Sequence, residues 1–371
     1  MKTYRSRLLL SAAIAVMFLA AIVVQPLASA AQSASGQDGA TTAQAPDSED
    51  SLKDADTFDK ASIEADPVAP DDTSSSTAAP VPAKKVFPIP VPLPGGLDHV
   101  ANGVGTRNAG FGTIRLRGAH NGATAVRAFL YWGEIIDGPA IALTQTVLFR
   151  GTPVTGSLVG VSSPPCWPGT FFVAYRASVI ALLAPTINGD YLVSRLPSSI
   201  TDGRDPWLHA PVPAPRPLSE GASLVVIYAH SSVPITARVF LNQGATMFFG
   251  AVSINNPLPQ PLPPYNILKH TRLGADGQVL FSTFATAPIT DERTFIGPGA
   301  AGATQIKGPF SPFNGDSDWN GSDGGPLNQL WDTQSSSLSG APISPGVTNY
   351  VVRYISHGDC IVAVAHVLGV K

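Results

Sequence analysis

The sequence is poor in charge, and its few charges are balanced. Lysine, arginine, aspartate and glutamate make up 13% of the 371 residues, and the formal net charge is −3. Between residues 97 and 371, 15 acidic residues stand against 16 lysines and arginines, which leaves a net charge of +1. Because the basic residues are scattered rather than clustered, there is no electrostatic reason to expect nucleic acid as a partner.

Several catalytic and metal-binding motifs are also missing. None of the seven histidines is spaced as H-x-x-x-H or H-x-H, so no zinc motif is present. The chain has no G-x-S-x-G turn. Ser317 stands in a Gly-Asp-Ser block that resembles the nucleophile block of GDS-type esterases, but their Asp-x-x-His partner is absent from the chain. The glycine-rich segment 297–304 lacks the lysine of a phosphate-binding loop. These absences argue against a serine hydrolase, a zinc enzyme and a nucleotide-binding enzyme.

Long apolar runs are confined to the N-terminus. Lys2, Arg5 and Arg7 precede the apolar run Leu8–Val24, and an A-x-A cleavage pattern ends at Ala30. This layout predicts a secretory signal peptide over residues 1–30; an uncleaved membrane anchor is the alternative. No later stretch is long enough to span a membrane, so we expect a secreted or cell-envelope protein with no membrane span after signal removal.

Aromatic residues are nearly absent from the segment that follows. Residues 31–96 are rich in alanine, serine, threonine and proline, and residues 31–85 carry 11 acidic residues against four lysines. Such a composition cannot offset the entropy of ordering the chain, so we expect a disordered acidic linker. It closes with the proline-stiffened connector Phe87–Gly96.

Cysteine is scarce, with two residues in the whole chain, Cys166 and Cys360. An exported protein meets an oxidising compartment, so an even count predicts one disulfide between them. The bridge would close a loop of about 195 residues. Two unpaired buried thiols are the alternative.

Residues 97–371 show the alternation of short β-strands. We expect strands at 111–118, 124–132, 144–151, 170–177, 190–195, 222–229, 235–243, 278–284, 349–356 and 360–369. Helix signals are scarce; residues 177–185 could form one or two turns. The nearly continuous apolar runs at 222–229 and 360–367 should be central strands. The pattern predicts an all-β domain, a large β-sandwich or jelly roll.

An ordered set of motifs resembles a known but uncharacterised module. The motifs are Arg127–Glu134, Tyr175–Leu183, Gly221–Ala229, Asn314–Gln334 and Asp359–Val370. Together they resemble a β-sandwich module of exported bacterial and archaeal cell-surface proteins. The resemblance implies an adhesion-like surface role and supplies no catalytic residues.

The clearest candidate metal site is an acidic loop late in the chain. Asp316, Asp318 and Asn320, followed by Gly321, match the start of a calcium loop, and Asp323 offers a further oxygen. Leu327 stands where an EF-hand needs its glutamate, so any calcium loop is of another kind. A solvated polar turn is the alternative.

Two residues next to a predicted strand suggest a ligand site. Trp132 could stack on a sugar ring, and Glu134 is one of three glutamates between residues 97 and 371. We expect a noncatalytic protein that binds an extracellular glycan or protein ligand and is ordered by calcium. The alternative is a secreted polysaccharide hydrolase in which Glu134 works with a second carboxylate.

Overall fold

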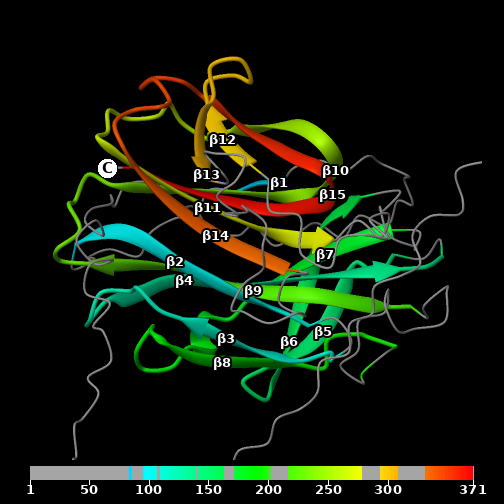
Figure 1. Ribbon diagram of the computed structural model, residues 1–371. Coiled ribbons are helices and arrows are strands. Elements are labelled where there is room, and N and C mark those ends of the chain that lie inside the picture. Colours follow the sequence, from blue (N-terminus) through cyan, green and yellow to red (C-terminus); the bar gives the residue numbers. More distant parts are fainter. Residues whose placement is uncertain are drawn as a thin grey trace, which may run out of the picture. The chain divides into compact units, whose positions relative to one another are not determined.

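The computed structural model describes residues 83–85, 95–106, 109–138, 141–162, 171–199, 201, 216–277, 293–307 and 331–370. Within these ranges every regular element is a β-strand except the 3-10 turn Ile180–Leu182. This turn falls in the segment expected to form one or two helical turns. The strands form two antiparallel sheets (Figure 1), and the expected all-β, sandwich-like fold is confirmed. No helix in the described ranges is long and apolar enough to cross a membrane.

The first sheet has eight strands and is called here the curled sheet. Its strands are β2 (Gly96–Gly105), β3 (Gly112–Leu116), β4 (Thr124–Ile136), β5 (Thr144–Phe149), β6 (Thr152–Ser162), β7 (Phe171–Ser178), β8 (Gly189–Ser194) and β9 (Leu218–His230). Their order is β2-β9-β4-β7-β6-β5-β8-β3. The two edge strands approach each other, because the side chain of Asn102 on β2 donates a hydrogen bond to the carbonyl of Arg115 on β3 (2.9 Å). The sheet therefore curls around its own core.

The second sheet has seven strands and is called here the bent sheet. Its strands are β1 (Ala83–Lys85), β10 (Arg238–Pro257), β11 (Ile267–Gly277), β12 (Arg293–Gly297), β13 (Thr304–Lys307), β14 (Trp331–Ser339) and β15 (Asn349–Val370). The main order is β1-β10-β15-β11-β14, and β12 pairs with β13 and β15. Ala83–Lys85, in the predicted linker, thus forms a strand against β10.

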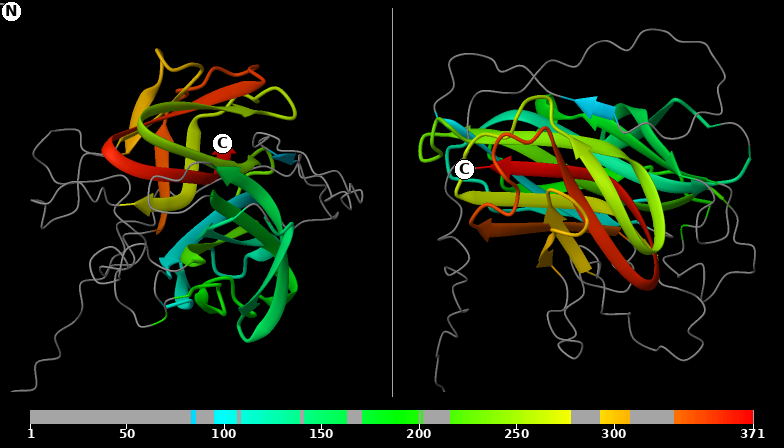
Figure 2. Two further views of the ribbon diagram at one scale, coloured as in Figure 1. Left: turned by 90° about the vertical axis from the view of Figure 1, so that its right-hand side faces the viewer. Right: turned by 90° about the horizontal axis from the view of Figure 1, so that it is seen from above.

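The 22-residue strand β15 folds back on itself. Its first part pairs with β12 and its last part with β11, while β10 pairs with both. The rings of Tyr354 and His366 are 5.9 Å apart, centroid to centroid. A straight strand would separate these residues by about 40 Å. Figure 2 shows the curved course of β15 at the red end of the chain. The bend lets the sheet enclose an apolar core of its own, which includes Leu268, Val352 and Leu368.

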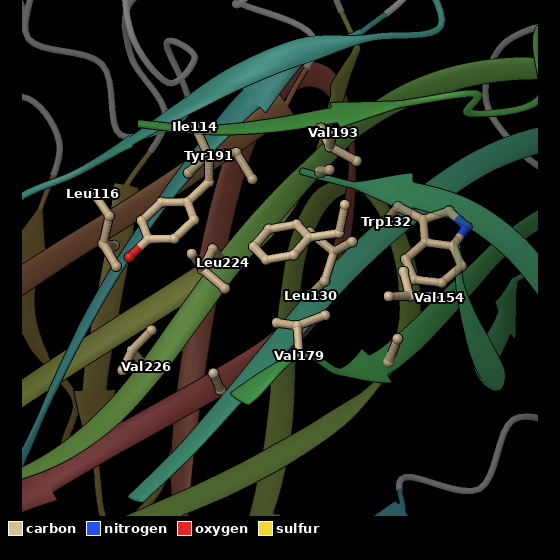
Figure 3. Close-up of a cluster of buried hydrophobic side chains, with 14 of the residues drawn as sticks. Ile114, Leu116, Leu130, Trp132, Val154, Val179, Tyr191, Val193, Leu224 and Val226 are labelled. Carbon is tan, nitrogen blue, oxygen red and sulfur yellow. The ribbon is translucent and has the colours of Figure 1, made fainter. Parts of the chain in front are cut away.

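Alternation along the strands divides the buried side chains between cores. On β4, Leu130 and Trp132 point into the curled sheet (Figure 3), whereas Phe129 and Tyr131 face the bent sheet. Trp331 of β14 packs in the layer between the two sheets. Burial of this alternating pattern is the main force that fixes the register of a strand such as β4.

Polar contacts also join the two sheets. The ammonium group of Lys269 on β11 donates to the Asp98 carboxylate (3.2 Å) and to the carbonyl of His99 (2.6 Å), both on β2. The indole N–H of Trp331 donates to Ser223 Oγ on β9 (2.7 Å). These bonds satisfy buried groups that would otherwise lose hydration without compensation.

Candidate functional site

Glu134, the candidate site residue from the sequence, lies near the end of β4, beside a β-bulge. Gly133 pairs with Gly221 of β9, but the next residue, Glu134, pairs with Ser219, which leaves Glu220 as the extra residue. Glu134 is two residues beyond Trp132 and therefore shares its face, the inside of the curled sheet. Bulges at strand ends redirect side chains and are common beside functional sites.

One amide side chain connects the two residues that the sequence singled out. The indole N–H of Trp132 donates to Oε1 of Gln145 on β5 (2.5 Å). The amide nitrogen of Gln145 donates in turn to Oε1 of Glu134 (2.5 Å). The indole N–H can only donate, so the Gln145 oxygen must accept from it. The Gln145 amide nitrogen is then the group that donates to Glu134. Gln145 therefore holds the Glu134 carboxyl in one orientation.

The second carboxyl oxygen of Glu134, Oε2, has a different environment from Oε1. Oε2 is buried and has no hydrogen-bond partner in the described ranges, and only 3% of the residue is exposed. Burial raises the pKa of Glu134 to about 7, and the hydrogen bond from Gln145 opposes this rise. In the described part of the chain, no second carboxylate contributes to the shift. At neutral pH, Glu134 is therefore poised between its acid and carboxylate forms.

Tyr175 of β7 completes the site. Its ring stacks on that of Trp132, with centroids 5.7 Å apart, and its hydroxyl donates to the carbonyl of Ala142 (2.9 Å). Burial, and then the negative charge of Glu134, raise the pKa of Tyr175 to about 12. The phenol therefore stays neutral at any physiological pH.

Trp132 contributes its indole N–H to the site, because its ring faces are buried. The residue is fully buried in the core of the curled sheet (Figure 3). A Cβ atom on Gly156 of β6 would overlap the indole ring, so a glycine is needed where β6 passes it. Stacking of a ligand on Trp132 stays a prediction.

The other residues predicted from sequence fall outside what the structure describes. Asp316, Asp318, Asn320 and Asp323 lie between β13 and β14, in the segment 308–330. Cys166 lies in the segment 163–170. The backbone of Cys360 pairs with residues of β10 and β11, but its side chain is outside the described set. Calcium binding and the disulfide therefore stay predictions. Within the described ranges, no group of three or more histidine, cysteine or acidic side chains is placed to hold a metal ion.

Sequence reasoning missed Gln145 and Tyr175, although periodicity contains a signal for both. Gln145 shares a strand face with the buried residues Val147 and Phe149. A polar residue in register with inward apolar residues must find a polar partner inside. Tyr175 is likewise in register with the inward residue Val173.

Comparisons with known proteins give no family. No family model matches the chain, and no curated protein matches it. Among solved structures, the 3.5 Å cryo-EM structure of the Sputnik virophage matches 76% of this chain and 86% of its own, at 10% sequence identity and a TM-score of 0.17. A TM-score this low does not indicate a shared fold, and nothing about this chain follows from it.

Proposed function

We propose that this is an exported, noncatalytic β-sandwich protein that binds an extracellular glycan at the Glu134 end of the curled sheet. The observation that carries this proposal is the buried Oε2 of Glu134, which has no hydrogen-bond partner among the residues that the structure describes. An unpaired buried polar atom costs about 1–3 kcal/mol, and a ligand hydroxyl that bonded to it would remove this cost. The amide of Gln145 already occupies the other oxygen, so Oε2 is the atom free to select a ligand.

A neutral, hydroxyl-rich ligand suits this carboxyl better than an ion does. With a pKa of about 7, Glu134 can donate a hydrogen bond as an acid and accept one as a carboxylate. Sugar hydroxyls can be both donors and acceptors. A metal cation would need several more oxygen ligands, and an anion would be repelled by the carboxylate form. A protein ligand that offers a serine, threonine or tyrosine hydroxyl is an outcome that the binding test distinguishes.

The proposed location rests on the N-terminal sequence. The signal-peptide pattern of residues 1–30 and the acidic linker after it support export, and the resemblance to surface modules supports retention at the cell envelope. We further propose that calcium orders the loop containing Asp316, Asp318, Asn320 and Asp323, because alternating oxygen side chains match calcium ligation.

Binding to a panel of glycans and isolated cell walls tests the proposal. The purified exported protein should bind a panel member, and Glu134→Ala should abolish that binding. Glu134→Gln should keep it, because an amide can accept from Gln145 and still donate to a ligand, but the affinity should no longer vary between pH 6 and pH 8. Asp190→Asn, which alters an exposed carboxylate on β8, is the matched control. Unchanged binding by Glu134→Ala would refute this placement of the site.

One observation favours a second candidate, a polysaccharide hydrolase. A carboxyl with a pKa near 7 is suited to act as a general acid at neutral pH. Release of reducing ends from the bound glycan, abolished in Glu134→Gln, would support it. A protein that binds the glycan but releases no reducing ends over days would exclude it.

The proposed disulfide has an independent test. Intact mass after thiol alkylation without reductant should show no label on Cys166 or Cys360, and two labels after reduction. Labelling of both cysteines before reduction would show that the thiols are unpaired.

A further inference from the structure

The bent sheet carries a ladder of polar side chains on the face that points into its own core. Across β11 and β14, His270 pairs with Ser336, Arg272 with Gln334, and Gly274 with Asp332. On its other side, Arg272 pairs with His366 of β15. Paired residues share a face with Cβ atoms about 5 Å apart, and alternate rungs are about 7 Å apart. We call His270, Arg272, Asp332, Gln334, Ser336 and His366 the polar ladder.

The polar ladder lies inside the molecule. His270, Arg272 and Asp332 are fully buried, His366 is 4% exposed and Ser336 is 9% exposed. The apolar neighbours on this face include Leu268 and Leu368, which belong to the core of the bent sheet. Charged side chains are almost never fully buried without a specific reason.

The bend in β15 places two tyrosines over the ladder. The hydroxyl of Tyr354 lies 3.3 Å from Nδ1 of His366, and the same nitrogen lies 3.3 Å from Nε2 of His270. The ring of Tyr350 meets that of His270 edge-on, with centroids 6.4 Å apart. The ladder is thus enclosed between β11 and β14 on one side and the first part of β15 on the other.

Several ladder atoms have no hydrogen-bond partner in the described part of the protein. They are Nδ1 of His270, Oγ of Ser336 and both carboxyl oxygens of Asp332. Gln334 and the backbone N–H of Thr333 lie near Asp332 and favour its anion. Native proteins satisfy nearly all buried polar atoms, and a concentration of exceptions on one face indicates a missing polar partner.

The charges of the ladder decide what kind of partner it selects. Burial, and then the charge of Arg272, lower the pKa of His366 to about 3, and burial lowers the pKa of His270 as well, so both imidazoles are neutral. Burial also lowers the pKa of Arg272, to about 10, which leaves it cationic. Asp332 faces Arg272, Tyr354 and Lys307 of β13, and burial raises its pKa to about 7 in spite of the two cations. Below neutral pH the ladder therefore holds a positive charge that its own carboxyl does not cancel.

We propose that the polar ladder is an internal binding site for a small oxyanion of the carboxylate or phosphate class. Arg272 supplies the charge, and Ser336 and His270 donate hydrogen bonds. Asp332 takes up a proton when the oxyanion binds, since two adjacent anions repel each other. Affinity therefore rises as the pH falls from 8 to 6. The site lies on the other sheet from Glu134 and does not depend on the proposed glycan function.

Thermal unfolding and calorimetry with sodium phosphate, sulfate and acetate, each against chloride at equal ionic strength, test this site. At least one oxyanion should raise the melting temperature of the wild-type protein, and more at pH 6 than at pH 8. Ser336→Ala should weaken its binding about fivefold, as expected for one lost hydrogen bond. Asp332→Asn should keep the binding and lose its pH dependence. Phosphate and acetate, measured separately, show which class of oxyanion is preferred.

Ser335→Ala is the matched control. Ser335 is the next residue along β14, but its hydroxyl bonds Thr271 on the opposite face (2.7 Å). This variant should keep the full oxyanion-dependent shift, and so should Glu134→Gln. The proposal is overturned if no tested oxyanion raises the melting temperature above that in chloride at either pH. It is also overturned if Ser336→Ala leaves the shift unchanged.

Discussion

Replacing Glu134 with glutamine should change how the stability of this protein depends on pH. Burial raises the pKa of Glu134 from 4.5 to about 7. Its contribution to stability is therefore complete below pH 4.5 and is lost as the pH rises through 7, because the unfolded chain ionises first. Glutamine has nearly the same shape and does not titrate, so the variant should escape this loss.

The size of the effect follows from the shift. A change of about 2.5 pH units corresponds to about 3 kcal/mol at 1.36 kcal/mol per unit. The residue is only 3% exposed, so solvent screens this energy little. Between pH 4.5 and pH 8, the stability difference between variant and wild type should move by about 3 kcal/mol in favour of the variant.

Urea unfolding of both proteins at four or five pH values measures this difference directly. Other groups titrate over the same range, but their effects cancel when the two proteins are compared at one pH. Asp190→Asn removes one exposed carboxylate and controls for the change in net charge. A stability difference that stays constant within about 0.5 kcal/mol between pH 4.5 and pH 8 would refute the argument that Glu134 is held in a desolvated, half-protonated state.

Three further predictions follow from other parts of the chain. Burial lowers the pKa of His366 to about 3, so protonation below pH 6.5 destabilises the folded wild-type protein. The melting temperature of His366→Gln should therefore fall less between pH 7 and pH 5 than that of the wild type. Gly156→Ala should cost about 1–3 kcal/mol in urea unfolding, because the new methyl group meets the Trp132 ring, whereas Gly299→Ala meets no atom within 4 Å and should be nearly neutral. Millimolar calcium should raise the melting temperature of the wild type above its value in chelator, and Asp318→Asn should remove this rise. If the wild type melts at the same temperature in calcium and in chelator, the calcium loop is excluded.

Hydrophobic alternation was enough to predict the strands whose buried faces are apolar. β3, β4, β5, β7, β8 and β9 all overlap the expected ranges. β9 and β15 are central strands, as their continuous apolar runs indicated. The two strands expected at 349–356 and 360–369 are one strand with a bend, which periodicity cannot distinguish from two strands separated by a turn.

Three of the strands that were not predicted have polar residues on buried faces. β2 buries Asp98 and His99, β11 buries His270 and Arg272, and β14 begins with the buried pair Trp331 and Asp332. Charged residues are expected at the surface, so these segments do not match the apolar alternation of a buried strand. Five of the six polar-ladder residues therefore lie on strands that the sequence pattern does not predict; the sixth, His366, lies on β15.

The candidate site was predictable only in part, for a related reason. Glu134 and Trp132 were found because an acid and an aromatic residue stand at the end of an obvious strand. Their link through Gln145 depends on β5 lying near the end of β4 inside the curled sheet, and that is a property of the strand order. The pattern of one sequence does not show which of its strands lie side by side.

The course of β15 has a consequence for the order in which the protein can fold. Val370 pairs with Arg238 of β10 and with Leu268 of β11, so the centre of the bent sheet joins residues about a hundred positions apart. β15 lies between β10 and β11, so neither strand can complete its pairing before β15 has been added to the sheet. Pairings this distant in sequence form slowly, and before they form the edges of β10 and β11 are open. A chain threaded N-terminus first through a membrane would thus keep this half unfolded during passage, and the sheet would close only after β15 had emerged.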